Sequence, residues 1–72
     1  MTIVQWKKKF AKRLSRRMEQ LGLSQNRLAK LSGVSQASIC RYLKAKQLPS
    51  AVVIRKLCKT LSMTQAELVE FN

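Results

Sequence analysis

Apolar side chains recur every three or four residues along most of the chain, which is the spacing of one face of an α-helix. The longest such stripe consists of Trp6, Phe10, Leu14, Met18 and Leu21. It predicts a first helix over residues 3–21, with Thr2 and Gln5 at capping-box spacing where the helix begins. Gly22 follows the stripe and can adopt the left-handed conformation that ends a helix.

Four shorter helices are predicted after Gly22, each behind a residue that is a good N-cap, namely Ser24, Ser35, Ser50 or Thr64. They cover residues 25–32, residues 36–44, a segment whose stripe ends at Leu61, and a short final segment. Their expected core residues are Leu28, Ala29, Leu31, Ile39, Tyr42, Leu43, Val53, Ile54, Leu57, Cys58, Leu61, Leu68, Val69 and Phe71. Together these elements predict an all-α fold, a compact five-helix bundle forming one domain over residues 1–72.

The charge of the chain favours a polyanionic partner. Fifteen Lys and Arg residues stand against three acids, which gives a formal net charge of +12. Such an excess suits nucleic acid or, less often, an anionic membrane surface. No apolar run reaches the roughly 20 residues that cross a bilayer, and the N-terminus does not have the pattern of a signal peptide.

The residues of metal and acid–base chemistry are scarce. There is no histidine, the only acids are Glu19, Glu67 and Glu70, and the two cysteines, Cys40 and Cys58, lack CxxC spacing. We therefore expect no enzyme activity, no metal, no cofactor and no small-molecule ligand. The cysteine pattern also fits a reducing cytoplasm, and Cys58 lies on an apolar stripe where a core role is expected.

Residues 23–43 carry the strongest functional signal. Ala29 is small enough to let two helices approach closely, and Gly33 supplies the positive φ that a tight interhelical turn needs. Ser24 and Ser35 cap two helix N-termini, and such ends attract phosphate. The outer face of the second of these helices presents Gln36, Ala37, Cys40, Arg41 and Lys44.

This pattern resembles the lambda-repressor-like helix-turn-helix proteins, the XRE family, which includes phage repressors and Cro proteins. The resemblance covers about residues 10–71. It rests on Leu23-Ser24-Gln25, Leu28-Ala29, Gly33-Val34-Ser35-Gln36, Ser38-Ile39, Pro49-Ser50, Leu57 and Leu61 in that order. It implies a bundle whose third helix docks in the major groove of DNA.

The resemblance also implies roles for individual residues. The positions that match base-reading residues are Gln36, Ala37, Cys40 and Arg41. The positions that match phosphate contacts are Gln25, Asn26, Ser35, Ser38, Lys44 and Lys46. The glutamine at position 25 is also implied to brace Gln36, the first residue of the recognition helix.

The chain departs from the family pattern at three places. Ala45 and Ser62 stand where a glycine often ends the third and fourth helices, which leaves the loop contacts of Lys44 and Lys46 open. Met18 and Leu43 stand where many members have an arginine and a glutamate that form an internal ion pair. A packed apolar pair can replace such an ion pair without loss of stability, so we expect these two side chains to touch.

Several residues allow two interpretations. The run Lys7-Lys8-Lys9 is a solvated helix face or a DNA-wrapping arm, and Ser38 faces DNA or only its own backbone. Cys40 fits a small groove-facing side chain better than a redox switch. Trp6, Val69 and Phe71 belong to the core or to a dimer face.

These observations predict a sequence-specific transcriptional regulator of bacterial or phage origin, a repressor of phage or mobile-element type. We expect a homodimer on a double-stranded DNA operator, with half-sites about 34 Å apart. One rival is an antitoxin that holds a partner protein; it would be expected to carry a toxin-binding segment beyond Asn72. Another is a basic membrane-surface peptide, against which Gly33, Pro49 and the internal caps argue.

Overall fold

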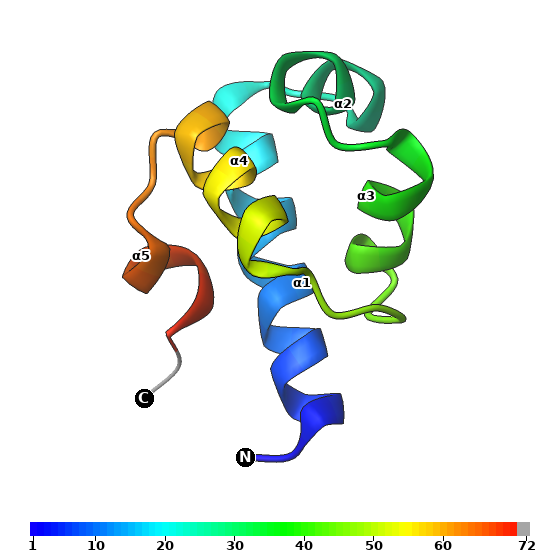
Figure 1. Cartoon of the computed structure of the whole chain (residues 1–72), viewed down its shortest axis with the longest axis vertical. Coiled ribbons are helices and arrows are strands. Elements are labelled where there is room, and N and C mark those ends of the chain that lie inside the picture. Colours follow the sequence, from blue (N-terminus) through cyan, green and yellow to red (C-terminus); the bar gives the residue numbers. More distant parts are fainter. Residues whose placement is uncertain (71–72) are drawn as a thin grey trace.

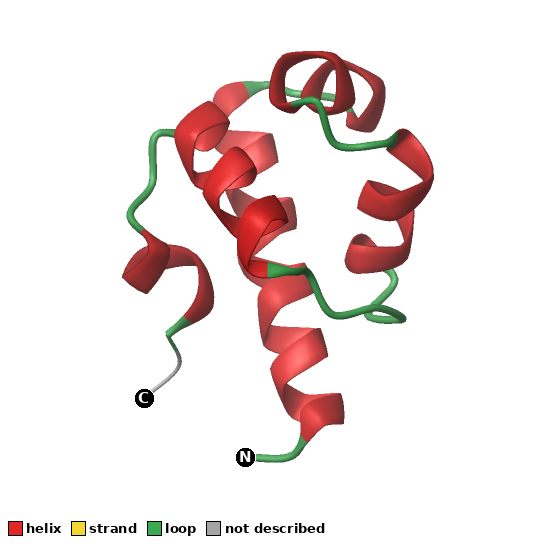
Figure 2. Cartoon of the chain, viewed as in Figure 1, coloured by secondary structure: helices red, strands yellow, loops and turns green. Residues whose placement is uncertain are grey.

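The chain folds into the predicted helical bundle. The computed structural model describes residues 1–70, and in this part of the chain it contains five α-helices and no strand (Figure 2). They are α1 (Ile3–Leu21), α2 (Gln25–Ser32), α3 (Gln36–Leu43), α4 (Ala51–Leu61) and α5 (Gln65–Val69). The bounds agree with the sequence prediction, except that α3 ends one residue earlier, at Leu43. Phe71, predicted for the core or a dimer face, lies outside the described residues.

Every helix begins at the N-cap that its sequence indicates. The hydroxyls of Ser24, Ser35 and Ser50 each accept a hydrogen bond from the backbone N–H three residues later, at 3.1 to 3.2 Å. Thr2 and Thr64 form complete capping boxes with Gln5 and Glu67. Each cap satisfies a helix-end N–H that has no partner within the helix, so the starts of all five helices are fixed locally.

Left-handed residues end the first four helices, whereas α5 ends at Glu70 with extended backbone. Gly22 and Gly33 end α1 and α2 with φ of 66° and 75°, as predicted. At the end of α3 the Ala45 and Lys46 N–H groups donate to the carbonyls of Tyr42 and Arg41, which is the Schellman pattern of hydrogen bonds. Ala45 therefore adopts φ of 57° where a glycine is the usual choice, and Ser62 does the same at the end of α4 with φ of 54°.

Helix α1 runs along the length of the molecule and organises the others (Figure 1). It packs against α3, α4 and α5, while α2 packs against α3 and α4. No helix among residues 1–70 is long and apolar enough to cross a membrane. In Figure 1, α2 and α3 lie on one side of α4, and α5 lies on its other side. Helices α2 and α3 therefore form a distinct pair at one edge of the bundle.

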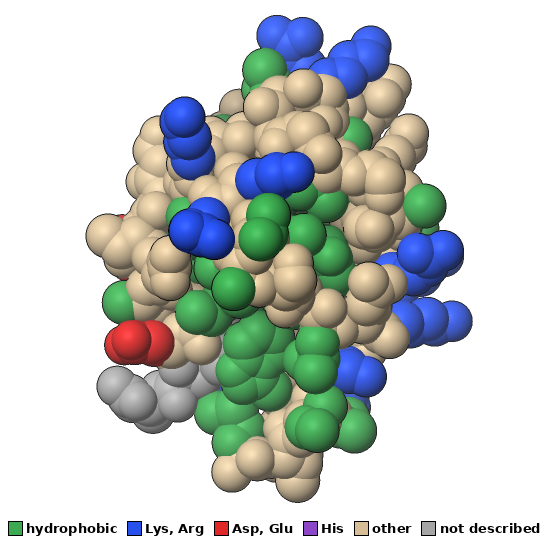
Figure 3. Space-filling view, in the orientation of Figure 1, with side chains coloured by type: hydrophobic (Ala, Val, Ile, Leu, Met, Phe, Trp, Pro, Cys, Tyr) green, Lys and Arg blue, Asp and Glu red, His purple; other side chains and the backbone are tan. Residues whose placement is uncertain are grey.

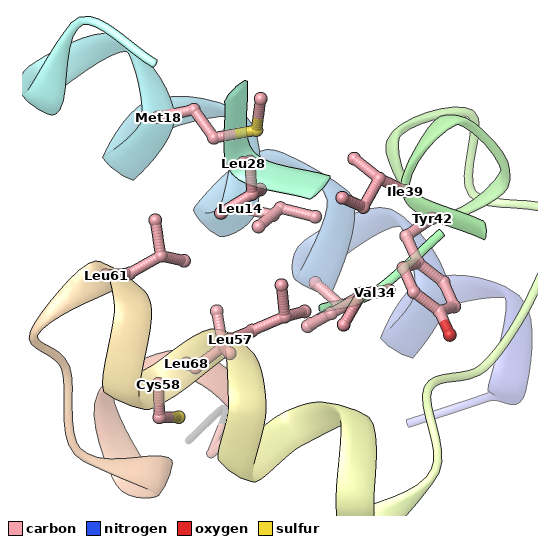
Figure 4. Close-up of a cluster of buried hydrophobic side chains, with 11 residues drawn as sticks. Leu14, Met18, Leu28, Val34, Ile39, Tyr42, Leu57, Cys58, Leu61 and Leu68 are labelled. Carbon is pink, nitrogen blue, oxygen red and sulfur yellow. The ribbon is translucent and has the colours of Figure 1, made fainter. Parts of the chain in front are cut away.

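The core draws on all five helices (Figure 4). The fully buried side chains are Phe10, Leu14, Leu28, Ile39, Leu57, Leu61 and Leu68. Phe10 stacks on Trp6 at a ring-centroid distance of 5.5 Å and meets Tyr42 edge-on at 5.8 Å. Cys58 is buried as expected, and this burial raises the pKa of its thiol, with a smaller contribution from the Glu67 carboxylate.

Two leucines of the predicted helices are exposed, one from the apolar stripe of the first helix and one from the expected core residues. Leu21 is 43% exposed because it is the last residue of α1, beyond the part of this long helix that the other helices cover. Leu31 is 52% exposed because α2 buries Leu28 against the core and leaves Leu31 at its rim, in a hollow beside Lys56 and Lys59 of α4. Trp6 and Val69, for which two interpretations were open, are partly buried and pack against the core.

Candidate nucleic-acid interface

Helices α2 and α3 form a tight helix-turn-helix unit. Gly33 makes the turn: its N–H donates to the Ala29 carbonyl at 3.0 Å, and its φ is positive. A Cβ at this glycine would meet nothing within 4 Å, so the backbone conformation rather than space requires a glycine here. Val34 and Ile39 are 6% and 0% exposed, which anchors the turn and the inner face of α3 in the core, as predicted.

The opposite face of α3 is turned to solvent. Gln36, Ala37 and Arg41 are exposed, and Cys40 is half-buried beside them. Among the residues that the structure describes, the side chains of Gln36 and Arg41 have no hydrogen-bond or ion-pair partner. The four positions predicted to read bases therefore share one face of α3, on which the long polar side chains of Gln36 and Arg41 are free to bind. Whether they contact DNA stays a prediction.

The N-termini of α2 and α3 offer free backbone donors. Only the third N–H group of each helix is capped by a serine hydroxyl, at Arg27 and at Ser38. The N–H groups of Gln25 and Asn26, and likewise those of Gln36 and Ala37, have no acceptor within residues 1–70. Because these groups lie at the positive end of a helix dipole, each terminus is suited to hold a phosphate oxygen.

The serines at the start of α3 are engaged with each other. The Ser35 hydroxyl donates to the Ser38 hydroxyl at 2.9 Å and accepts from the Ser38 N–H at 3.1 Å. The Ser38 hydroxyl thus pairs with the Ser35 side chain in the free chain, and its own hydrogen remains able to donate. Phosphate contacts by both serines remain predictions, compatible with this geometry.

Gln25 lies beside Met18 and Leu43, the apolar pair at the positions where many family members have an ion pair. It lines an open hollow of about 340 Å³ together with Met18, Leu43, Glu19 and Ser15, among others. Met18 is buried and Leu43 is partly buried against the core, and both line this hollow, while direct contact between the two side chains stays a prediction. No hydrogen bond joins Gln25 to Gln36 in the described chain, and the implied brace between them stays a prediction for the DNA-bound state.

The loop after α3 keeps its two lysines available. Lys44 ends the helix and Lys46 donates its N–H back to the Arg41 carbonyl at 2.9 Å, while both side chains are exposed. Because Ala45 reproduces the glycine-type ending, replacing the usual glycine does not extend α3. Figure 3 shows Lys and Arg side chains spread over the α2, α3 and α4 regions of this face of the molecule.

Sequence reasoning missed a role for two arginines of α1. Arg17 donates from Nε to the Leu61 carbonyl at 2.9 Å, and Arg13 donates to the Glu67 carbonyl at 2.9 Å. These carbonyls lie near the C-terminal ends of α4 and α5, where helix carbonyls lack partners. Both arginines are therefore structural links between helices far apart in the sequence, whereas Arg16 in the same hollow makes no hydrogen bond among residues 1–70.

The described chain offers no metal centre, since residues 1–70 contain no group of three or more Cys, Asp and Glu side chains that could hold an ion.

Comparisons with known proteins agree with this geometry. Residues 9–71 match the helix-turn-helix domain family. Among solved structures, an HTH_3 family transcriptional regulator from Vibrio cholerae superposes with a TM-score of 0.87 at 25% identity, over 93% of this chain. This chain spans only 38% of that regulator. A search of curated proteins gives no match.

The restriction-modification controller protein C.AhdI from Aeromonas hydrophila is also similar. It superposes with a TM-score of 0.82 at 34% identity, over 86% of this chain and 94% of its own. The family match begins within α1 and spans all of α2 to α5, and both neighbours share the bundle. The chain therefore belongs to the helix-turn-helix domain family, with the lambda-repressor-like fold that its sequence resembles.

Proposed function

We propose that the chain is a transcriptional regulator that reads double-stranded DNA by placing α3 in the major groove. The observation that carries this proposal is the outer face of α3, where Gln36 and Arg41 are exposed and unpartnered beside two helix N-termini with free N–H groups. A net charge of +12 supplies the attraction to a polyanion.

Phosphate contacts would position α3. The amides at the start of α2, with Gln25 and Asn26, hold one phosphate, and Ser35 and Ser38 lie beside the amides at the start of α3. Lys44 and Lys46 hold the backbone at the other end of α3. Contacts at both ends of a short helix fix its register along the groove without reading sequence.

Base edges are then read by the exposed face. Arg41 has the planar fork that bonds the O6 and N7 atoms of guanine together, and Gln36 has the amide that pairs in the same way with adenine. Ala37 and Cys40 are small side chains that allow close approach and can contact a thymine methyl group.

We further propose that the regulator acts as a homodimer on a two-fold operator, and represses by occluding a promoter. The two solved neighbours are named as a transcriptional regulator and a restriction-modification controller protein, which supports a regulatory role. The controller protein is matched over 94% of its solved chain, so that chain consists of little more than this fold.

The test compares two exposed arginines. Arg41→Ala should weaken binding to a selected operator by about 1–3 kcal/mol and relax the preference at one base pair per half-site. Arg16→Ala removes the same charge from α1 and should leave base preferences intact. Affinities are measured on the operator and its single-base variants. If Arg41→Ala weakens binding to every duplex equally, Arg41 binds phosphate only and does not read bases as proposed.

A further inference from the structure

The N-terminal end of α1 and the connection from α3 to α4 form an exposed apolar surface (Figure 3). One open hollow of about 340 Å³ is lined there by Met1, Thr2, Ile3, Trp6, Leu48, Pro49 and Ile54. Val4 and Val52, in the first turns of α1 and α4, are also exposed. We call these nine residues the N-terminal apolar surface.

The size of this surface is that of half an interface. Its most exposed side chains are Met1 at 64%, Ile3 at 63%, Val4 at 60%, Val52 at 52% and Leu48 at 45%. Together they present on the order of 500 Å² of apolar area, which is at the upper end of the largest patch on an ordinary monomer. Two such surfaces in contact would bury about 1,000 Å² of apolar area, enough for a specific interface once a polar rim is added.

The charge pattern favours a second copy as the occupant. Lysines and arginines cover the chain, yet none of them lines this hollow, where the N-terminal ammonium of Met1 is the one charged group among the lining residues. Two chains of net charge +12 repel each other, so they approach most readily where both carry the least charge. An acidic protein or an anionic membrane would instead be expected to meet a surface that includes lysine or arginine.

The position of the surface suits a dimer that binds DNA. Leu48 and Pro49 lie in the connection of residues 44–50 that follows α3 directly. A two-fold contact uses the same surface on both copies, so joining them here would bring the ends of the two α3 helices towards the axis and set their separation. We propose that the N-terminal apolar surface is the contact between two copies of this chain, an inference that rests on the proposed DNA-binding function.

A distinctive salt dependence follows. Salt screens the repulsion between the copies but does not weaken an apolar contact, so dimerisation in solution should strengthen as salt rises. Binding to DNA should weaken as salt rises, because phosphate contacts release counterions. An acidic partner or an anionic lipid surface would bind less tightly at high salt, which separates these occupants from a second copy.

The experiment is sedimentation equilibrium of the full chain at about 50 mM and about 500 mM salt, with three variants. Ile3→Glu and Val52→Glu place a charge in the N-terminal apolar surface, and both positions are in first helical turns, where an acidic side chain favours the helix. Leu31→Glu is the control: it changes the net charge equally at a residue 52% exposed on α2, away from the surface.

The parent should form dimers more tightly at the higher salt. The dissociation constant of the dimer should rise at least about tenfold in Ile3→Glu and Val52→Glu, a loss that a buried unpaired charge readily causes. It should not change in Leu31→Glu. Circular dichroism checks that all variants remain folded.

Three results would overturn the proposal. The parent could stay monomeric in solution and bind a duplex with two half-sites without cooperativity, or both surface variants could dimerise as the parent does. The parent could instead bind vesicles of equal phosphatidylserine and phosphatidylcholine through Ile3 without dimerising, which would assign the surface to lipid.

A duplex with a single half-site separates this proposal from the one it rests on. If only the dimer contact is lost, Ile3→Glu binds the single half-site as tightly as the parent and loses affinity for the double site. If the parent shows no base preference on either duplex, the proposed function fails whatever the sedimentation shows.

Discussion

Replacing Ala45 by glycine should stabilise the protein. Ala45 has φ of 57°, a conformation in which Cβ crowds the backbone at a cost of roughly 1–2 kcal/mol for a non-glycine residue. Glycine removes that cost but gains freedom in the unfolded chain, which offsets about 0.5–1 kcal/mol. The expected net gain in the free energy of unfolding is about 0.5–1 kcal/mol. The same reasoning applies to Ser62, with φ of 54°.

A variant with both Ala45→Gly and Ser62→Gly should gain the sum of the two single stabilisations. No hydrogen bond joins the turn at Ala45 to the turn at Ser62 within residues 1–70, so the two gains should add to about 1–2 kcal/mol. Such a gain raises the Tm of a domain of this size by about 4–8 °C for each kcal/mol. Affinity for DNA should not change, because the Schellman hydrogen bonds that end α3 are the same with glycine.

The assay is urea unfolding followed by circular dichroism, with Ala66→Gly as the control. Ala66 is exposed within α5, where glycine is expected to cost about 0.5–1 kcal/mol. The sign of the effect should thus differ between two alanine-to-glycine changes in one protein. If Ala45→Gly destabilises the fold as Ala66→Gly does, the left-handed ending of α3 is wrong.

Three further predictions concern the packing of α1 and the capping of α5. Leu43→Glu should lower stability by about 1–3 kcal/mol in urea, less than at a fully buried site because Leu43 is only partly buried, while repulsion from Glu19 in the same hollow adds to the loss; an unchanged midpoint would contradict the α1–α3 alignment. Arg17→Ala should cost about 1 kcal/mol through its bond to the Leu61 carbonyl, whereas Arg16→Ala should cost almost nothing; equal effects would remove the structural role of Arg17. Hydrogen bonds from the Thr64 N–H and hydroxyl hold the pKa of Glu67 below its usual range, so its stabilising effect is present above the unfolded pKa and is lost as the pH falls through the folded one. Urea midpoints of the parent and Glu67→Gln should therefore differ at pH 7 and converge in acid, and a gap independent of pH would exclude this linkage.

The helices could be predicted closely because local chemistry defines their ends. Serine or threonine precedes each of them, and a single hydroxyl-to-backbone bond is enough to set each start. The end of α3 was harder to predict, since Ala45 adopts its backbone conformation only because the surrounding hydrogen bonds impose it. Leu31 shows the limit of periodicity: it is apolar and at helical spacing, yet the packing of α2 on α4 leaves it outside.

The candidate interface also contains features that the sequence predicts and features that it does not. The outer face of α3 follows from helical geometry once Ile39 and Tyr42 are assigned to the core. The exposure of Gln36 and Arg41 could therefore be predicted from the sequence. The carbonyls that Arg13 and Arg17 bind lie more than forty positions away in the chain, and nothing local indicates such partners. Contacts that depend on tertiary arrangement are the part that a single sequence does not reveal.

The most direct measurement of the central claim is the affinity of the parent chain for a duplex selected from a random pool, compared with a shuffled duplex of equal composition. Both are measured by fluorescence anisotropy at physiological salt. A protein that reads bases through α3 should bind the selected duplex at least about 10³-fold more tightly. Equal affinity for the two duplexes would show that the chain holds DNA by charge alone, and would contradict recognition by Gln36 and Arg41.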